Sequence, residues 1–411
     1  MRLSFFLAKR IAFNKGSSFS KFIINIAVAA TAISVSVMIL ATSLVNGFKQ
    51  TVQGKVFNFW GNIHITRYQP NAGPLTEEIP FSNRKSLFDS LSKAPDLKSI
   101  SPYATKSALL KSDKETEGII FKGVTKDYDW DQLKPFLKSG HFVQFNDTAY
   151  SPQILISESM ANELQLKVND RPIIYFVQGG GLTPRARRLT VAGIYKTSIE
   201  EYDKTYVIGD LDLIRKMNNW EPNDIGGYEI MLKDYKQMDT VAWYINDNLI
   251  PEELFPRTIR DIYPNIFDWL GLQDRNELIT IIIMTIVAII NMTTAILILI
   301  LERTNMIGIL KSLGMRNWSI QNIFIYQAAY IVFLGVLIGD FFGLGLAFLQ
   351  QQTGLFKLPE DTYYMSAAAI SINWIDIVLI NVGTFLICTI ILAIPSRIIR
   401  SITPVKAIQF K

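Results

Sequence analysis

Four long segments almost free of charge constrain this chain more than any other feature. The first, residues 22–48, contains no Asp, Glu, Lys or Arg. A helix needs about 20 apolar residues to cross a bilayer, whereas the apolar core of a secretory signal peptide has only about 7 to 15. We therefore predict an uncleaved transmembrane helix at 22–48, with a cleaved signal peptide as the alternative. Further transmembrane helices are predicted at residues 276–301, 319–349 and 375–395.

Ordinary globular sequence lies between the first two of these segments. In residues 49–267 the pattern changes to short strands and amphipathic helices. The strand-like stretches are GNIHITRY near Ile63, EGIIFKGV from Glu117, RRLTVAGIY from Arg187 and GYEIMLK from Gly227, and the helical ones are RKSLFDSL from Arg84, SESMANELQL from Ser157, DLDLIRKM from Asp210 and QMDTVAWYINDNL from Gln237. We predict an α+β domain with its own core, and residues 127–223 are a candidate second lobe. The fold class is thus a polytopic α-helical membrane protein with four transmembrane helices and a large α+β domain inserted between the first and second.

The distribution of Lys and Arg predicts the orientation in the membrane. The arm 1–21 has five basic residues and no acid, the loop 302–318 has three basic residues, and the tail 396–411 has four and no acid. The remaining loop, 350–373, has one lysine against two acids. Because basic loops stay on the cytoplasmic side, both termini and the loop 302–318 are predicted to be cytoplasmic, and the large domain lies on the other side.

The loop 302–318 is itself patterned as a short amphipathic helix. Apolar residues recur at three- and four-residue spacing, at Met306, Ile307, Leu310 and Leu313. Thr304 is expected to cap its start and Gly314 to end it with a positive φ, while Asn317 or Ser319 is expected to cap the next helix. The stretch either rests on lipid headgroups or docks a partner outside the membrane.

The third apolar segment carries small residues at regular intervals. Gly335, Gly339 and Gly343 recur every four residues, which predicts a face that packs closely on another span in this chain or in a partner. Asp340 lies about one membrane thickness along the same helix from Ser319. We therefore expect this acid near the far interface rather than at the centre of the bilayer.

Several classes of chemistry have no support in the sequence. There is no G-x-x-x-x-G-K-[ST] motif for nucleotide binding, no H-E-x-x-H and no G-x-S-x-G. The only cysteine is Cys388, and the two histidines, His64 and His141, stand apart, so no metal site is expected. A net charge of +5 without a basic stripe gives no reason to expect nucleic acid binding. Catalysis by this chain is not expected.

Several motifs together resemble a known family. The end of the first span, LVNGF at Leu44–Phe48, the stretch ERTNMIGILKSLGMRNWSIQNIFIYQA from Glu302 and the ending PSRIIRSITPVKAIQF from Pro395 resemble the FtsX/MacB-type permeases of ABC transporters. The stretches GNIHIT, RRLTVAGIYKTSIEEYDKTYV, IFDWLGLQDRNELI and KLPEDTYYMS narrow the resemblance to the LolC/LolE lipoprotein-releasing permeases. The resemblance covers nearly the whole chain.

This resemblance implies a permease of the bacterial inner membrane whose large domain is periplasmic. In this family two permease chains, identical or different, pair with two cytoplasmic ATPase chains of the LolD type, which bind ATP and Mg²⁺. ATP-driven motion extracts a triacylated lipoprotein from the outer leaflet and passes it to a periplasmic chaperone of the LolA type. The chain itself is then expected to hold no cofactor and no metal, and to contact membrane lipid.

The resemblance also implies three sites. The family's coupling helix matches Thr304–Leu313 and implies ATPase contacts at Glu302, Arg303, Met306, Ile307, Leu310, Lys311 and Leu313. A dry apolar seat for lipid chains is expected at Val37, Met38, Ala41, Val45, Phe48, Phe267, Leu270, Ile282 and Ile286, although such residues can equally face lipid or pack together. The loop that hooks the chaperone matches Val177–Arg188, with Gly179–Gly181 as its mobile part, Thr183, Pro184 and Arg185 as its tip, and Arg187 and Arg188 before the next strand.

Two other functions within this wide family remain open at this stage. One is a MacB-like extruder of periplasmic substrates, although that branch normally carries an ATPase domain that this chain lacks. The other is an FtsX-like signalling permease that transmits ATPase motion to cell-wall hydrolases. A neighbouring gene for a lipoprotein-type ATPase points to lipoprotein release, and a neighbouring gene for a hydrolase points to the signalling function.

Overall fold

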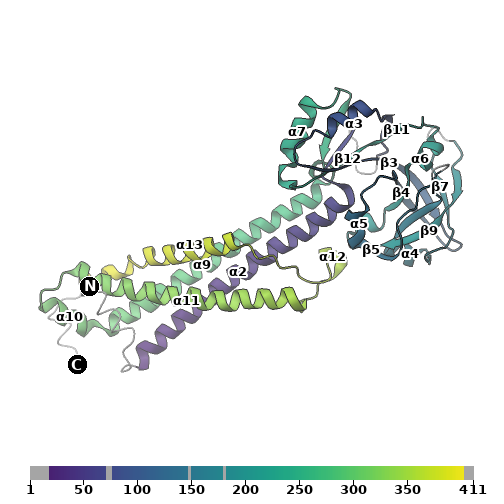
Figure 1. Cartoon of the computed structure of the whole chain (residues 1–411). Coiled ribbons are helices and arrows are strands. Elements are labelled where there is room, and N and C mark those ends of the chain that lie inside the picture. The colour runs from purple at the N-terminus through teal and green to yellow at the C-terminus, as the bar shows by residue number, and fades with distance from the viewer. Residues whose placement is uncertain (1–17, 71–75, 147–149, 179–181, 402–411) are drawn as a thin grey trace. The chain divides into compact units, whose positions relative to one another are not determined.

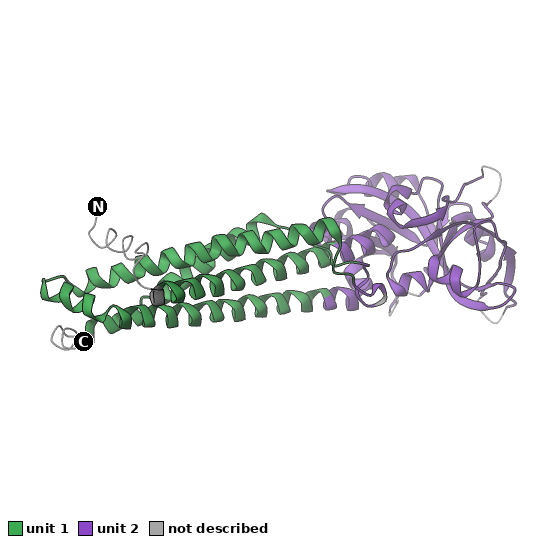
Figure 2. Cartoon of the chain, turned by 90° about the horizontal axis from the view of Figure 1, so that it is seen from below, with its two compact units in different colours: residues 1–50, 270–357, 367–411 green, residues 51–269, 358–366 purple. Residues whose placement is uncertain are grey.

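The computed structural model describes residues 18–70, 76–146, 150–178 and 182–401. Most of the predicted arm 1–21 and most of the tail 396–411 therefore lie outside the described residues. The chain divides into two compact units (Figure 2). One comprises residues 1–50, 270–357 and 367–411, and the other comprises residues 51–269 and 358–366.

Four long apolar helices build the first unit (Figure 1). They are α2 (Ser18–Trp60), α9 (Pro264–Glu302), α11 (Asn317–Thr353) and α13 (Trp374–Ile391), joined by the shorter α10 (Thr304–Ser312) and followed by the 3₁₀ helix η5 (Pro395–Ser401). Each long helix has the length and composition needed to cross a membrane. At 1.5 Å per residue, the 43 residues of α2 extend over about 65 Å, and α9 and α11 are nearly as long. These helices therefore extend beyond the predicted spans.

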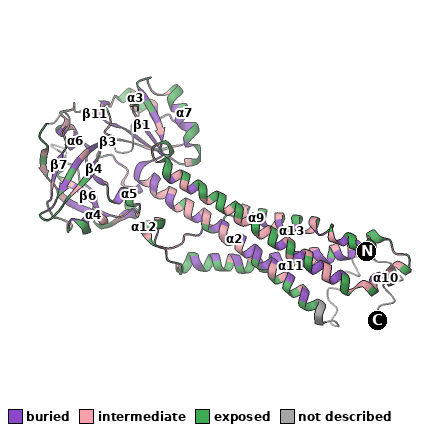
Figure 3. Cartoon of the chain, turned by 180° about the vertical axis from the view of Figure 1, so that it is seen from behind, coloured by how far each residue is buried: buried purple, intermediate pink, exposed green. Residues whose placement is uncertain are grey.

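The bundle is apolar both inside and outside. Each long helix contributes to a common core, for example through Met38, Met292, Phe324 and Cys388. Apolar side chains also cover the exposed faces, for example Phe341, which is 75% exposed. Figure 3 shows that buried and exposed residues both recur along each long helix. Soluble proteins rarely expose so much apolar surface, whereas lipid surrounds it favourably. The first unit is therefore suited to a membrane, as the four segments almost free of charge predicted.

The glycine row of α11 lies against α2 of the same chain. A Cβ atom at Gly339 would lie 2.8 Å from Val35 Cβ, and Gly335 and Gly343 have similarly close neighbours on α2. Ser36 Oγ donates a hydrogen bond of 2.8 Å to the carbonyl oxygen of Gly339. Only residues without a side chain allow this approach, so the glycines bring two apolar helices into backbone contact.

A mixed sheet of eleven strands organises the second unit. Its main path runs β13-β1-β12-β3-β4-β10-β6-β9-β5, while β7 pairs with β3 and β8 pairs with β7. The strands are β1 (Ile63–Arg67), β3 (Leu97–Lys111), β4 (Thr116–Val124), β5 (Leu137–Gly140), β6 (Gln153–Ser157), β7 (Ile173–Phe176), β8 (Arg185–Arg188), β9 (Thr190–Tyr195), β10 (Tyr206–Asp210), β12 (Gly227–Leu232) and β13 (Leu254–Thr258), and a separate pair is formed by β2 (Phe81–Ser82) and β11 (Asp224–Ile225). The pairs β4/β10 and β6/β9 are parallel.

Short helices complete this α+β unit. They are α3 (Lys85–Leu91), η1 (Trp130–Gln132), η2 (Lys134–Phe136), α4 (Glu158–Glu163), α5 (Glu200–Asp203), α6 (Leu211–Asn218), η4 (Tyr235–Gln237), α7 (Met238–Asn248), α8 (Ile259–Ile262) and α12 (Glu360–Tyr363). The predicted helices near residues 84, 157, 210 and 237 are confirmed, and Ser157 and Asp210 cap α4 and α6 through their side chains.

One predicted strand is in fact two. The stretch RRLTVAGIY was expected to be a single strand, but β8 ends at Arg188 and β9 begins at Thr190, and the buried Leu189 lies between them. The candidate lobe 127–223 contributes β5, β6, β9 and β10 to the same continuous sheet, because β10 pairs with β4.

Candidate functional site

Local backbone geometry defines α10, the short helix between α9 and α11. Gly314 follows it with φ +84°, as predicted. The predicted caps are wrong. Thr304 is already inside the helix, and its hydroxyl donates to the carbonyl of Leu301. Arg316 precedes α11 with an extended backbone and no side-chain cap, so neither Asn317 nor Ser319 fills that role.

The apolar stripe of α10 is divided between the bundle and the exterior. Ile307 is fully buried in the bundle core, and Met306 and Leu310 are half-buried against the same core. Leu313 is 78% exposed and Ile309 is 53% exposed. The expectation that Ile307 offers an apolar anchor to a partner is therefore corrected, because its side chain seats α10 in its own bundle. Ile309, which the sequence analysis passed over, lies one helical turn before Leu313 on the exposed side.

Lys311 also points back into its own chain. Its Nζ atom donates to the carbonyl oxygen of Ile399, at 2.6 Å, in η5. Nearby, Nε2 of the buried Gln321 donates to the carbonyl oxygen of Ser396 at 3.2 Å. The segment after α13 thus braces α10 and the start of α11. Glu302 is exposed and Arg303 is half-buried at the preceding turn.

The residues expected to seat lipid chains differ in their exposure. Met38 and Leu270 are buried, Val37, Ala41, Val45, Phe48 and Phe267 are half-buried, and Ile282 and Ile286 are about half exposed. Met38 packs against α9, since its sulfur lies 3.8 Å from Thr285 Oγ1. Met38 and Leu270 are thus covered by their own chain, whereas the half-buried residues of α2 are partly accessible, and the lipid seat stays a prediction.

Polar pairs tie the apolar helices together. Asn381 Nδ2 on α13 donates to Asp340 Oδ2 on α11 at 2.9 Å. Lys49 Nζ on α2 lies 2.7 Å from Asp274 Oδ1 on α9, and both residues lie just outside the predicted spans. The sequence singled out Asp340 but not its partner, because Asn381 lies in a different apolar segment. The depth of Asp340 in the membrane stays a prediction.

The predicted chaperone loop lies between β7 and β8 and includes β8 itself, and these two strands pair as an antiparallel hairpin. β7 pairs with β3, and β8 extends that ribbon by pairing with β7. Gly179–Gly181 lie outside the described residues. Of the residues predicted to contact a chaperone, Thr183, Pro184 and Arg188 are exposed, while Arg185 and Arg187 are half-buried.

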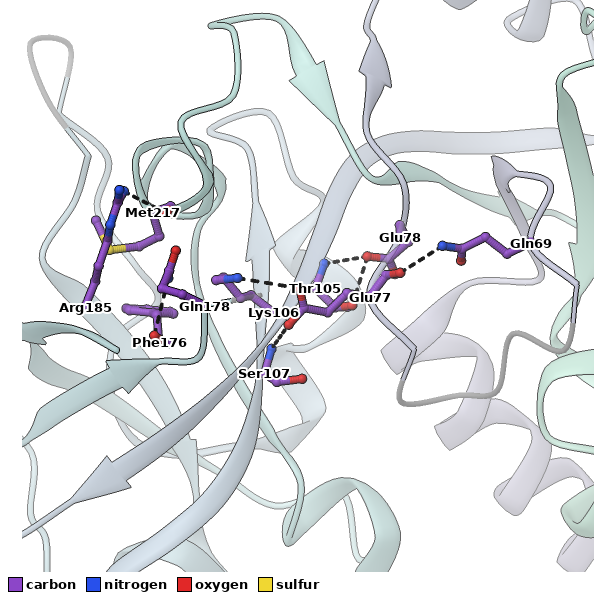
Figure 4. Close-up of polar contacts among 10 residues, drawn as sticks. All are labelled: Gln69, Glu77, Glu78, Thr105, Lys106, Ser107, Phe176, Gln178, Arg185 and Met217. Atoms are coloured by element: carbon purple, nitrogen blue, oxygen red, sulfur yellow. Dashed lines mark hydrogen bonds and ion pairs between the residues drawn. The ribbon is translucent and has the colours of Figure 1, made fainter. Parts of the chain in front are cut away.

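Arg185 anchors this hairpin to a neighbouring helix. It was predicted at the tip, but it lies in β8, where Nη1 donates to the carbonyl oxygen of Met217 at the end of α6, at 2.9 Å (Figure 4). The same nitrogen lies 2.9 Å from Asn219 Oδ1. A guanidinium on the last carbonyls of a helix is favourable, because those groups lack partners within the helix. The predicted tip position of Arg185 is therefore corrected.

Two glutamates fill a gap beside β3 that the sequence did not reveal. Among the residues that the structure describes, no strand pairs with residues 104–107 on the side where β12 and β7 pair with the rest of β3. There Glu78 accepts hydrogen bonds from the amide and hydroxyl of Thr105, at 2.8 and 2.9 Å, and Glu77 accepts one of 2.8 Å from the amide of Ser107 (Figure 4). Burial raises the pKa of Glu78. These carboxylates support the sheet next to the hairpin.

Two family models match the chain. The model of the MacB-like periplasmic core domain matches residues 26–247, which is more than half of the chain. The model of the FtsX-like permease C-terminal matches residues 278–404. The first match covers α2 from residue 26 onward and most of the α/β unit, and the second covers most of the apolar helices that follow.

Known proteins resemble the chain over most of its length. The lipoprotein-releasing system transmembrane protein LolC of Neisseria meningitidis serogroup B is 22% identical over 419 residues, which cover 97% of this chain and 96% of the relative. The corresponding LolE protein of Haemophilus influenzae is 22% identical over 368 residues, 86% of each chain. Among solved structures, the periplasmic region of MacB from Actinobacillus actinomycetemcomitans aligns with 53% of this chain and 97% of its own, with 13% identity and a TM-score of 0.36.

The order of domains and the full-length relatives agree with one another. The match to the MacB-like core domain begins within the first apolar helix and continues through most of the α/β unit, and the FtsX-like match includes most of the other three apolar helices. The chain therefore belongs to the ABC-transporter permeases that combine a MacB-like periplasmic core domain with an FtsX-like C-terminal segment, and among them it is of the LolC/LolE type.

Proposed function

We propose that this chain is the permease subunit of a transporter that extracts lipoproteins from the outer leaflet of the bacterial inner membrane. A partner ATPase of the LolD type binds ATP and Mg²⁺ and supplies the energy, and a periplasmic chaperone of the LolA type receives the lipoprotein. The similarity to lipoprotein-releasing proteins over nearly the whole chain supports this function over extrusion of periplasmic substrates and over control of cell-wall hydrolases.

The observation that carries the proposal is the seating of α10. A coupling element must be rigidly joined to the spans and must present a free face to its partner. The inner face of α10 is locked by Ile307 and by the bond from Lys311 to Ile399, while Ile309 and Leu313 remain exposed. The ATPase contact is then formed by Ile309 and Leu313 as apolar anchors, with Glu302 and Arg303 beside them.

In this proposal both termini and α10 are cytoplasmic and the α/β unit is periplasmic. A second permease chain, identical or related, completes the assembly. Lipid chains lie along the half-buried residues of α2, from Val37 to Phe48, and against Ile282 and Ile286 of α9. Thr183, Pro184 and Arg188 of the hairpin contact the chaperone.

A reconstituted complex in liposomes tests the proposal. The assay measures ATP hydrolysis and transfer of a triacylated lipoprotein to the chaperone. We expect Leu313→Asp to reduce both at least tenfold, because truncating or charging a central apolar anchor costs about 2 kcal/mol or more. Leu355→Asp is the matched control, since Leu355 is similarly exposed, at 63%, just beyond the other end of α11. Normal transfer by the Leu313→Asp complex would contradict the coupling role of α10, and absence of transfer by the wild-type complex would refute the function.

A further inference from the structure

The first long helix ends within the α/β unit. The last ten residues of α2 belong to that unit, and the last carbonyl groups of any helix have no partner within it. The amide of Gly61 donates to the carbonyl oxygen of Phe57 at 2.7 Å, with φ +70° at the glycine. A Cβ atom at Gly61 would also lie 2.9 Å from Cγ of Glu229. Both the backbone conformation and the space therefore require glycine where α2 meets the sheet.

Two side chains of the sheet hold the next carbonyl groups. Lys122 Nζ, from β4, donates to the carbonyl oxygen of Phe59 at 2.7 Å. His64 Nε2, from β1, donates to the carbonyl oxygen of Trp60, also at 2.7 Å. The hydroxyl of Tyr103 lies 3.1 Å from His64 Nδ1 and donates to it, which is consistent with the proton of the ring on Nε2. The ammonium of Lys122 thus lies at the negative end of the α2 dipole.

Lys122 is completely buried. Its ammonium lies 2.8 Å from Oε2 of the buried Glu229 on β12 and 4.2 Å from the centre of the Trp60 ring. A buried ion pair adds little to stability, because the loss of hydration offsets the attraction, and an apolar pair of similar volume is often as stable. The stability of the sheet therefore does not explain why a lysine is present. What the lysine adds is a bond to the backbone of α2.

We propose that Lys122 is a positioning residue that transmits displacements of α2 to the β-sheet. The name α2 joint is used here for Phe59, Trp60, His64, Lys122 and Glu229. The inference rests on the proposed function, in which ATP-driven motion of the apolar helices must reach the large domain. A backbone carbonyl cannot move to another rotamer, so the bond from Lys122 fixes the end of the helix to its strand.

The position of the joint in the sheet suits this role. β4 carries Lys122 and lies in the interior of the sheet, paired with β3 on one side and with β10 on the other. β1 and β12 are neighbours, and His64 lies directly opposite Glu229 in their pairing. A shift at the end of α2 therefore acts on three strands, β1, β4 and β12, at once.

A charge-free variant separates this role from folding. Lys122→Met combined with Glu229→Leu removes the ion pair, keeps the volume and leaves the carbonyl oxygen of Phe59 without its lysine. The control combines Lys106→Met with Glu77→Gln. Lys106 is also buried, and its Nζ lies 3.5 Å from Glu77 Oε2, but it forms no bond to α2 among the described residues. We expect both variants to fold, the control near the wild-type unfolding temperature and the Lys122 variant below it, because the Phe59 carbonyl loses its donor. Lys122→Gln with Glu229→Gln is the second variant, in case the apolar pair does not fold.

Two measurements decide the proposal. In the chain alone, in detergent, amide hydrogen exchange of the peptide containing Gly61 and Asn62 is expected to accelerate at least tenfold in the Lys122 variants and not in the control. In the reconstituted complex, lipoprotein released per ATP hydrolysed is expected to fall at least fivefold, while ATP hydrolysis persists.

Unchanged exchange, or wild-type release per ATP in a folded Lys122 variant, overturns the positioning role. The two hypotheses can fail separately, because exchange needs neither ATPase nor lipoprotein. A wild-type complex that releases no lipoprotein would refute the proposed function. Amide hydrogen exchange would still show whether the loss of Lys122 loosens the end of α2.

Discussion

His64 makes the stability of the α/β unit sensitive to mild acid. Its imidazole is buried, with one nitrogen bonded to the carbonyl of Trp60 and the other to the hydroxyl of Tyr103. Burial lowers the pKa of His64 from 6.5 to about 3, and the nearby Lys122 ammonium acts in the same direction. The folded protein therefore keeps this ring neutral at pH values where the unfolded chain protonates it.

The sign and the size of the effect follow from this difference. Between pH 6.5 and pH 3 the unfolded state binds one more proton than the folded state, so the free energy of unfolding falls as the pH falls. Each pH unit in this window removes about 1.4 kcal/mol, so acidification from pH 7 to pH 5 removes about 2 kcal/mol. Buried carboxyls such as Glu78 and Asp203, whose pKa values are raised by burial, act in the opposite direction. The contribution of His64 must therefore be measured as a difference between variants.

The measurement compares His64→Gln with the wild-type chain. Glutamine can still donate to the carbonyl of Trp60 but does not titrate, so the variant is expected to lose about 2 kcal/mol less than the wild type between pH 7 and pH 5. Unfolding of the full chain in detergent at the two pH values, followed by tryptophan fluorescence, gives the difference. His141→Gln is the control, since His141 is exposed. An equal loss in wild type and His64→Gln would refute the argument that a neutral buried ring makes the domain acid-sensitive.

Three further substitutions test the helix contacts. Gly339→Ala places a methyl group against α2 and is expected to lower bundle stability by about 1–3 kcal/mol in thermal unfolding, whereas Gly345→Ala, which faces open space, is not. Gly61→Ala combines a positive φ with a clash and is expected to cost more than 1 kcal/mol, and a stability equal to wild type would show that the turn can rearrange. Lys311→Met removes the bond to Ile399 and is expected to cost about 1 kcal/mol and to accelerate amide exchange in η5, so unchanged exchange there would argue against the brace.

The elements that local patterns specify could be predicted well. A run of about 20 uncharged residues has few alternatives to a membrane-spanning helix, and all four such runs are long helices. Capping residues at Ser157 and Asp210 and the glycine after α10 are equally local signals, since each involves bonds within a few residues. The order of the eleven strands is not local, and no spacing in the sequence indicates that β10 pairs with β4.

Periodicity also does not show which residues of an apolar stripe are exposed to a partner and which pack within the protein. On α10 the spacing grouped Met306, Ile307, Leu310 and Leu313, but the bundle covers Ile307 and leaves Leu313 exposed. The acceptor of Lys311 lies 88 residues further along the chain, so a charge that looked available to a partner is held within the protein. Candidate contact residues on a helix between two spans therefore have to be divided by burial before they are assigned to a partner.

Lys122 shows the same limit within a strand. In the stretch EGIIFKGV no local signal marks Lys122 as buried, because lysine is rarely buried without a partner and the partner is not visible in the sequence. The last six residues of β4 are instead buried on both faces, since the end of α2 lies over the face of Lys122 and α6 lies over the face of Gly123. A polar residue can remain there only with partners, and Lys122 has two, the Phe59 carbonyl and Glu229. Lys311 and Lys122 thus serve the same purpose in different surroundings. Each places an ammonium on carbonyl groups at the end of a helix, and the buried one joins a helix that begins in the apolar bundle to the sheet.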